Sequence, residues 1–386
     1  MNGITNVSRR SFIQTVAGAA GLALAFTLPE KSNAQFQGGV NVGPPPTNKP
    51  NAYIHITPDD SVTLTIIKAE MGQGPYTSLA MILAEELDCD WSKVRSEFAP
   101  VDPSAYGALQ GVVGSQSTRT LWTTMRTIGA TSRAMLVQAA AQKWNVPATQ
   151  VRTDAGFVVN TMTNERINYG AIAEAAAKLP VPTGVPLKDP KTFRIIGKPL
   201  KRLDTRDKVM GKAPFGIDAY MPGMLFAVVA RCPVFGGKVA KFDATKAKAV
   251  PGVVDVFEIS TGVAVVAENT WSAAQGRKVL DVTFDEGPNA NVSSASIFQM
   301  FADKAAQPGV KARMDGEGRD GLAKGVKKVE AVYQVPYLSH APMEPMNCTA
   351  HVTADGCEIW ASTQMQTPSR DYAARSEEHT SELQSH

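Results

Sequence analysis

The sequence predicts a mixed fold in which helices pack on small sheets, of the α+β or mixed α/β class. Strand-like runs of apolar and β-branched residues recur along the chain, separated by segments in which apolar residues follow helical spacing. With 44% hydrophobic and 19% charged residues the composition is that of a globular protein, so most of the chain is expected to fold. Its 386 residues suffice for two or three domains of roughly 100 to 200 residues each.

Folded structure is expected to begin near Ala52 with a hairpin. Residues 53–57 and 61–68 are strand candidates around the turn Pro58-Asp59-Asp60. A helix is predicted next, with one apolar face formed by Leu79, Ile82, Leu83 and Leu87. Residues 119–143 contain no proline and one glycine, and their apolar spacing predicts a long core helix.

Proline recurs five times from Leu179 to Pro199, which predicts a crossover connection and a domain boundary. The region 208–286 then alternates strand candidates with helical patterns, as expected for a compact α+β unit. These segments are residues 224–230, 240–250, 253–259, 263–267, 271–278 and 279–284. Residues 287–329 have weak periodicity, and strands are expected again at residues 328–335, 348–352 and 358–362.

Charge and cysteine content exclude several classes of site. The 39 Lys and Arg nearly balance the 36 Asp and Glu, and no basic run marks a nucleic-acid surface, so no nucleic-acid partner is expected. The cysteines are scattered and lack C-x-x-C spacing, so the chain is expected to supply no metal ligand directly and to hold buried thiols. They are Cys89, Cys232, Cys348 and Cys357, of which the last two could pair if their geometry allows it.

Residues 1–34 have the layout of a twin-arginine signal peptide. Arg9 and Arg10 precede a weakly hydrophobic stretch, and Ser32-Asn33-Ala34 provides small residues for cleavage after Ala34. A transmembrane anchor is the alternative, but the stretch is shorter than about 20 residues and ends at Pro29. Export of the folded protein to the periplasm is expected, a route useful chiefly when a cofactor is installed first. Residues 35–50 are expected to form a linker.

Two glycine-containing loops are the first candidate sites. Gly72, Gln73 and Gly74 lie between a predicted strand and a predicted helix, where glycine lets the backbone approach a ligand and free N–H groups would face an anion. The second loop, residues 111–118, contains Gly114, Ser115, Gln116 and Ser117 and leads into the long helix in the same way. An ordinary helix start capped by Ser115, Ser117 or Thr118 is the alternative for the second loop.

A third candidate lies near the end of the chain. His340 and Glu344 are spaced like a metal or acid–base pair, but Pro342 and Pro345 prevent the helix that would bring them to one face. A strand then leads to Ser362-Thr363-Gln364. The residues alone thus predict an exported α/β protein with a bound cofactor, and they contain no catalytic triad, P-loop or H-E-x-x-H motif.

Taken in order, these motifs resemble the large subunits of molybdenum hydroxylases of the xanthine dehydrogenase type, closest to the isoquinoline oxidoreductase beta-subunit branch. The likeness covers almost all of residues 50–374. Residues 70–74 resemble the family's pterin-binding turn, residues 215–225 with 251–254 its α/β-hammerhead domain, and residues 340–345 with 362–364 its second molybdenum-binding stretch. The hammerhead follows the turn here, as in the exported branch, whereas it precedes the turn in xanthine dehydrogenases.

The resemblance implies part of a molybdenum-cofactor-binding domain with an inserted hammerhead domain. The implied pterin-binding segment is 51–205, the hammerhead 206–290, a connector 291–329, and the start of the second molybdenum-binding segment 330–374. Gly72, Gln73, Gly74, Gly114, Ser115, Gln116 and Ser117 would hold the pterin and its phosphates. Gln364 would hydrogen-bond an oxo ligand of the metal, and Glu344 would support the site.

The implied cofactor is molybdenum-molybdopterin in its cytosine dinucleotide form. The implied reaction is hydroxylation of an N-heteroaromatic compound or an aldehyde with oxygen from water. Electrons would leave through a separate small subunit with two [2Fe-2S] clusters, with a cytochrome c as a candidate acceptor. The family's glycine-rich stretch and its Gly-x-Gly-Glu, which carries the general base, follow the position of Asp371, and neither occurs here.

From Arg375 the sequence departs from the family and resembles a translated sequencing adapter, so residues 375–386 are interpreted as a non-native tail. A natural polar terminus is the alternative. His379 and His386 are therefore not candidate ligands, and the chain is expected to be an inactive fragment without stoichiometric molybdenum. The alternative from another class is an exported solute-binding protein that takes a small anion in a two-lobed cleft.

Overall fold

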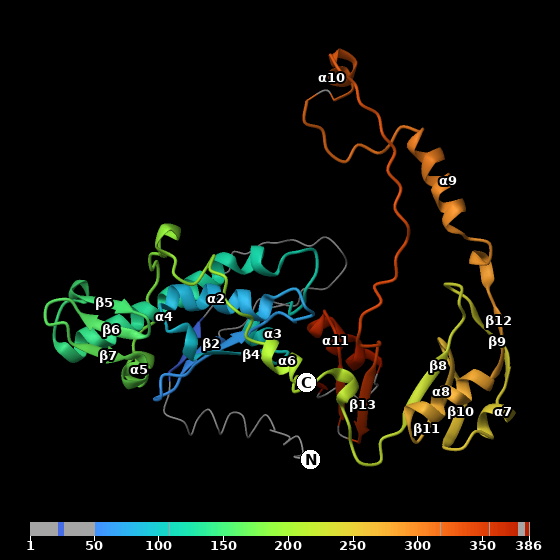
Figure 1. Ribbon diagram of the computed structural model, residues 1–386, viewed down its shortest axis with the longest axis horizontal. Helices are drawn as coiled ribbons and strands as arrows, with labels where there is room; N and C mark the ends of the chain where they lie inside the picture. Colours follow the sequence, from blue (N-terminus) through green and yellow to red (C-terminus); the bar gives the residue numbers. More distant parts are fainter. Residues whose placement is uncertain are drawn as a thin grey trace. The chain divides into compact units, whose positions relative to one another are not determined.

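The structure, a computed structural model, describes residues 22–26, 51–107, 109–316, 318–354, 356–376 and 383–385. Contacts divide the chain into two compact units, which Figure 1 shows as a ribbon. One contains the residues up to Ala219 and from Glu344 onward, and the other contains Tyr220–Met343. The predicted linker, most of the signal peptide and most of the tail lie outside the described residues. Within those residues, no helix has the length and apolar character to cross a membrane.

The first unit is built on a four-stranded sheet. Its strands are β1 (Leu22–Phe26), β2 (Asn51–Ile56), β3 (Val62–Ile66) and β4 (Val94–Phe98), in that spatial order. β2 and β3 pair antiparallel and confirm the predicted hairpin, with Asp60 in a left-handed conformation at the turn. β3 and β4 are parallel, so the chain must cross back between them.

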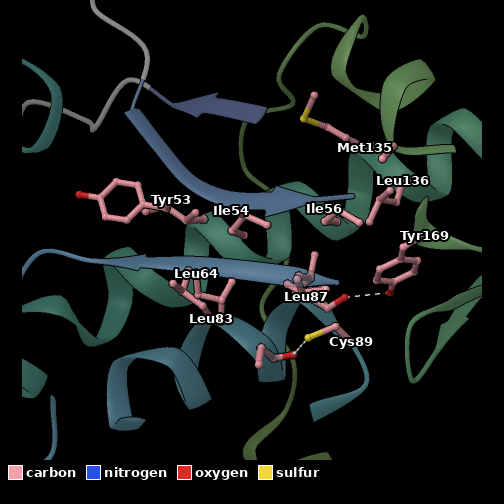
Figure 2. Close-up of a cluster of buried hydrophobic side chains, with 14 of the residues drawn as sticks. Tyr53, Ile54, Ile56, Leu64, Leu83, Leu87, Cys89, Met135, Leu136 and Tyr169 are labelled. Carbon is pink, nitrogen blue, oxygen red and sulfur yellow. Dashed lines mark hydrogen bonds between the residues drawn. The ribbon is translucent and has the colours of Figure 1, made fainter. Parts of the chain in front are cut away.

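That crossover contains helix α2 (Pro75–Leu87), which packs on α4 (Ser117–Trp144). Both helices were predicted, and the predicted apolar face of α2 is buried. Figure 2 shows Ile54, Ile56 and Leu64 of the sheet together with Leu83 and Leu87 of α2 and Met135 and Leu136 of α4 in one core. Gly129 permits this contact, because a Cβ there would lie 2.6 Å from the carbonyl oxygen of Leu83.

A second, small sheet of the first unit was not predicted. It consists of β5 (Val151–Asp154), β6 (Phe157–Asn160) and β7 (Arg166–Asn168), followed by α5 (Tyr169–Ala177). Its connection to the core includes the hydroxyl of Tyr169, which donates a hydrogen bond of 2.9 Å to the carbonyl of Leu87 (Figure 2). Two short helices, α3 (Pro103–Tyr106) and α6 (Thr205–Val209), complete the part before Ala219.

The same unit also contains the end of the chain. β13 (Cys348–Thr353) and β14 (Gly356–Ala361) confirm two predicted strands, β15 (Leu383–Ser385) pairs with β14, and α11 (Gln366–Ser376) follows β14. All four cysteines are thiols. Cys89 and Cys357 are buried as expected, whereas Cys232 is half-buried and Cys348 exposed. Cys348 lies opposite Ala361 rather than opposite Cys357, so this hairpin does not align the two thiols.

The second unit has the predicted alternation of strands and helices. One sheet has the order β10 (Val253–Ile259), β11 (Gly262–Ala267), β8 (Phe226–Ala230), and a second pairs β12 (Asp281–Asp285) with β9 (Lys238–Asp243). Helices α7 (Thr245–Lys248) and α8 (Thr270–Val279) lie between these strands in sequence. Buried side chains of Val256, Val263, Val265 and Leu280 form its core.

The connector differs from expectation in two ways. It contains α9 (Ser294–Ala305) and α10 (Gly318–Lys324), and Ser293 caps α9 by accepting a hydrogen bond from the N–H of Ser296. The strand predicted over residues 328–335 is wrong, because this segment pairs with no described strand. Its apolar side chains, such as those of Val332 and Tyr333, are about nine-tenths exposed.

Buried carboxylates at the end of α2 hold the proline-rich crossover in place. Glu85 is fully buried, and its Oε2 accepts hydrogen bonds from the backbone N–H groups of Arg194, Ile195 and Ile196 at 2.9, 2.6 and 3.1 Å. Lys188 donates to the carboxylates of both Glu85 and Asp88. Since this segment has almost no regular structure, its buried N–H groups need such acceptors.

We expect Glu85→Gln to destabilise the first unit by about 3 to 5 kcal/mol, because it removes one partner of a buried charge network. Burial alone raises the pKa of Glu85, but the N–H groups of Ile195 and Ile196 and the ammonium of Lys188 outweigh it and lower the pKa. The stability that this carboxylate provides is therefore present above its unfolded pKa and lost as the pH falls through its folded pKa.

Urea unfolding followed by tryptophan fluorescence between pH 7 and pH 3 measures this. The variant should lose less stability than the wild type on acidification. Glu174→Gln on the exposed surface of α5 is the control and should change stability by less than about 0.5 kcal/mol. Equal stability of Glu85→Gln and wild type would contradict the role given to this carboxylate.

Candidate functional site

The first glycine turn lies between β3 and α2, as predicted. Gly72 and Gly74 have φ values of 105° and 96°, which glycine adopts without strain. The carboxylate of Glu70 accepts hydrogen bonds from the N–H groups of Gly72, Gly74 and Tyr76 at 2.7, 3.0 and 3.2 Å. The expectation that these N–H groups are free for an external anion is therefore wrong, because the chain supplies its own anion at this helix start.

Two side chains stabilise the shape of this turn. Gln73 accepts a hydrogen bond from the N–H of Met71 at 2.7 Å and donates to the carbonyl of Ala69 at 3.1 Å, so its amide serves the turn itself. Arg202 donates to the carbonyl of Gly72 at 2.8 Å and pairs with Glu70 at 3.0 Å. Arg202 was not predicted from the sequence, since it lies 130 residues beyond Gly72 with no motif around it.

The second loop has a different electrostatic character. Gly114 and Ser115 are both in the left-handed conformation, with φ values of 60° and 54°, and the loop around them is exposed. α4 begins at Ser117 with Gln116 at the N-cap position, and no side chain caps it. The alternative of a helix start capped by Ser115, Ser117 or Thr118 is thus not what the structure shows. The N-terminus of this 28-residue helix carries the positive end of its dipole.

The third candidate segment docks on this second loop. The N–H of Val112 donates to the carbonyl of Gln364 at 2.7 Å. The N–H of Gln110 donates to the hydroxyl of Thr367 at 3.1 Å, and the N–H of Thr367 donates back to the carbonyl of Gln110 at 3.2 Å. Gln110 is completely buried. Its role in docking this segment was not predicted, because that role depends on contacts with residues more than 250 positions away.

Gln364 consequently lies where three segments meet. Its backbone binds Val112 of the second loop, and its side-chain Nε2 donates to the sulfur of Met71 in the first turn at 2.8 Å. Gly111 leaves room for the docked segment, since a Cβ there would lie 2.8 Å from the sulfur of Met365. The structure thus places Gln364 in contact with Met71, next to Gly72 in the first turn, and with Val112, two residues before Gly114.

Glu344 supports this arrangement from the adjoining segment. Its carboxylate accepts hydrogen bonds from the hydroxyl of Ser362 at 2.6 Å, the amide of Asn347 at 3.0 Å and the N–H of Ile217 at 2.9 Å. Burial alone raises the pKa of Glu344, but these donors outweigh it and lower the pKa. Glu344 is therefore an ionised carboxylate, and it fixes the hydroxyl of Ser362, two residues before Gln364.

The remaining candidate pair is His340 and Glu344. His340 belongs to the second unit and Glu344 to the first, and the residues around them form no helix. Among the described residues no group of three His, Cys, Asp or Glu side chains is placed to bind a metal ion. A cavity of about 220 Å³ lies at the other end of α2 and is lined by Glu85, Asp88 and Arg194, which are already paired.

The fold and these loops agree with the comparison to known families. A sequence profile described as the molybdopterin cofactor-binding domain matches residues 19–231, more than half of the chain. The chain therefore belongs to the molybdopterin cofactor-binding domain family. This confirms the predicted mixed α/β cofactor-binding fold and the resemblance to molybdenum hydroxylase large subunits.

Three relatives sharpen this assignment. The chain is 28% identical to the beta subunit of isoquinoline 1-oxidoreductase from Brevundimonas diminuta, over 95% of this chain and 53% of that protein. It is 30% identical to the membrane-bound aldehyde dehydrogenase (pyrroloquinoline-quinone) of Gluconacetobacter polyoxogenes, over 94% and 48%. It is 27% identical to a nicotinate dehydrogenase subunit of Pseudomonas putida, over 81% and 27%. The chain spans about half the length of the first two relatives.

We expect Thr367→Val to loosen the docked segment by about 1 to 3 kcal/mol, because it leaves the buried N–H of Gln110 without its acceptor. Hydrogen exchange followed by mass spectrometry should show faster exchange in residues 109–113 and 362–370. Thr349→Val in β13 is the control, since no described hydrogen bond uses that hydroxyl. Unchanged exchange in both segments would contradict the docking.

Proposed function

We propose that the chain is the molybdopterin-binding part of an exported molybdenum hydroxylase that oxidises an N-heteroaromatic compound or an aldehyde. The observation that carries this is the position of Gln364 beside Met71 of the first glycine turn and Val112 of the second loop. Contacts between segments about 300 residues apart in sequence support a single cofactor site to which all three contribute.

The described residues fit the pterin of such a cofactor at the first turn, but the N–H groups that Glu70 occupies there are not free to bind its phosphates. The exposed first turn can border a flat pterin, but three of its N–H groups are occupied by Glu70. Phosphates are therefore assigned to residues Gly114 to Ser117 of the second loop, at the start of α4. The exposed Gln364 amide would orient the metal end of the group. The bound cofactor would supply the two-electron redox centre.

The substrate class and the partners belong to the same proposal. Two relatives are named after the N-heteroaromatic compounds isoquinoline and nicotinate, and a third is named an aldehyde dehydrogenase. Two relatives are named as subunits, which favours a multi-subunit assembly. We assign the partner as a small subunit with two [2Fe-2S] clusters, the acceptor as a cytochrome c, and the cofactor as the cytosine dinucleotide form. The twin-arginine pattern and Ala34 support export with cleavage.

One relative's name contains pyrroloquinoline quinone, so the cofactor class needs a direct test. A longer protein whose reading frame continues past residue 375 should contain stoichiometric molybdenum, and its cofactor should yield a fluorescent pterin on oxidation and cytidine monophosphate on hydrolysis. Gln364→Ala should lower its turnover, with Gln299→Ala on the exposed α9 as the control. Pyrroloquinoline quinone in place of molybdenum and pterin would contradict the proposal.

The present chain expressed alone, in a host that makes the cofactor, should contain little molybdenum, because the family's glycine-rich stretch and general-base glutamate are not in it. Metal analysis by mass spectrometry measures this. Stoichiometric molybdenum together with substrate turnover would show instead that the chain is a complete enzyme.

A further inference from the structure

Lys68 lies between the two glycine loops. It follows β3 and precedes Glu70, so its backbone belongs to the approach to the first turn. Its ammonium crosses to the second loop, where it donates a hydrogen bond of 2.7 Å to the carbonyl of Gly111. One side chain thus connects both loops of the candidate site.

The positive charge of Lys68 is not neutralised within the part of the chain that the structure describes. No carboxylate there lies within ion-pair distance of it, and burial is the cause that lowers the pKa of its ammonium. Lys188, whose side chain is 12% exposed, differs because Glu85 and Asp88 both pair with it. A charge withdrawn from water without a counter-charge costs free energy, unless a ligand supplies one.

The ammonium also retains donor capacity. A lysine has three N–H donors, and the hydrogen bond to Gly111 uses one of them. The loop that Lys68 holds leads directly into α4, whose N-terminus has no side-chain cap. The first turn offers no comparable positive site, since Glu70 and Arg202 already pair there.

We propose that Lys68 binds a phosphate or diphosphate group at the second glycine loop, in addition to positioning that loop through Gly111. This deepens the proposed function, because it assigns to the anionic part of the cofactor a side chain that no motif identified. It also explains why a half-buried cation is placed where the chain provides only a neutral carbonyl.

The test uses inorganic pyrophosphate as the probe and the purified chain at low ionic strength, with binding measured by isothermal titration calorimetry. Lys68→Met should weaken binding about tenfold or more, the loss expected for one charge-assisted hydrogen bond. Lys68→Arg should retain most of the affinity, because it keeps the charge and the donor. Lys143→Met, an exposed lysine at the opposite end of α4, is the matched control and should bind like the wild type.

Lys68→Gln separates charge from loop positioning, since a glutamine amide can still donate a hydrogen bond. It should bind pyrophosphate as weakly as Lys68→Met, while hydrogen exchange in residues 109–116 stays close to wild type. Failure of the wild type to bind pyrophosphate, or equal binding by Lys68→Met, would overturn the inference. Molybdenum and pterin analysis of the longer protein tests the proposed function separately, so either can fail alone.

Discussion

The buried carboxylates at the C-terminal end of α2 are the interaction on which the first unit depends. Glu85, Glu86 and Asp88 are withdrawn from water, and they provide the acceptors that the proline-rich crossover lacks. Because a buried carboxylate without partners would be strongly unfavourable, α2 and the crossover must form together. The same helix packs on α4 through Gly129, so one charge network fixes the elements from which both glycine loops emerge.

The starts of α2 and α4 differ in charge. Its N-terminal turn is neutralised by Glu70, whose carboxylate occupies the N–H groups that a phosphate would otherwise take. Among the described residues no side chain caps the start of α4, and the ammonium of Lys68 donates to Gly111 in the loop that precedes it. Because the two helix starts differ in charge, the first turn provides a fixed backbone shape and the second loop provides a positive electrostatic potential.

Much of this could be predicted from the sequence, and the reason is local. The hairpin around Asp60, helix α2 with its apolar face and the long helix α4 follow from residues close together in the chain. The strand expected over residues 328–335 was wrong for the converse reason. Its β-branched residues suit a strand, but a strand also needs a neighbour to pair with, and nothing in its own composition supplies one.

By itself, the sequence determined the order of the motifs and the kinds of residue that each provides: the glycines of two loops, a late glutamine, and no cysteine cluster for a metal. Tertiary structure alone decided which of their groups remain available. Glu70 occupies the first turn, and Arg202 and Gln110 hold distant segments together. Lys68 lies between the loops, and no carboxylate of the described residues pairs with it. Hydrogen bonding and charge neutralisation depend on distances in space, and residues more than 100 positions apart leave no local pattern for such contacts.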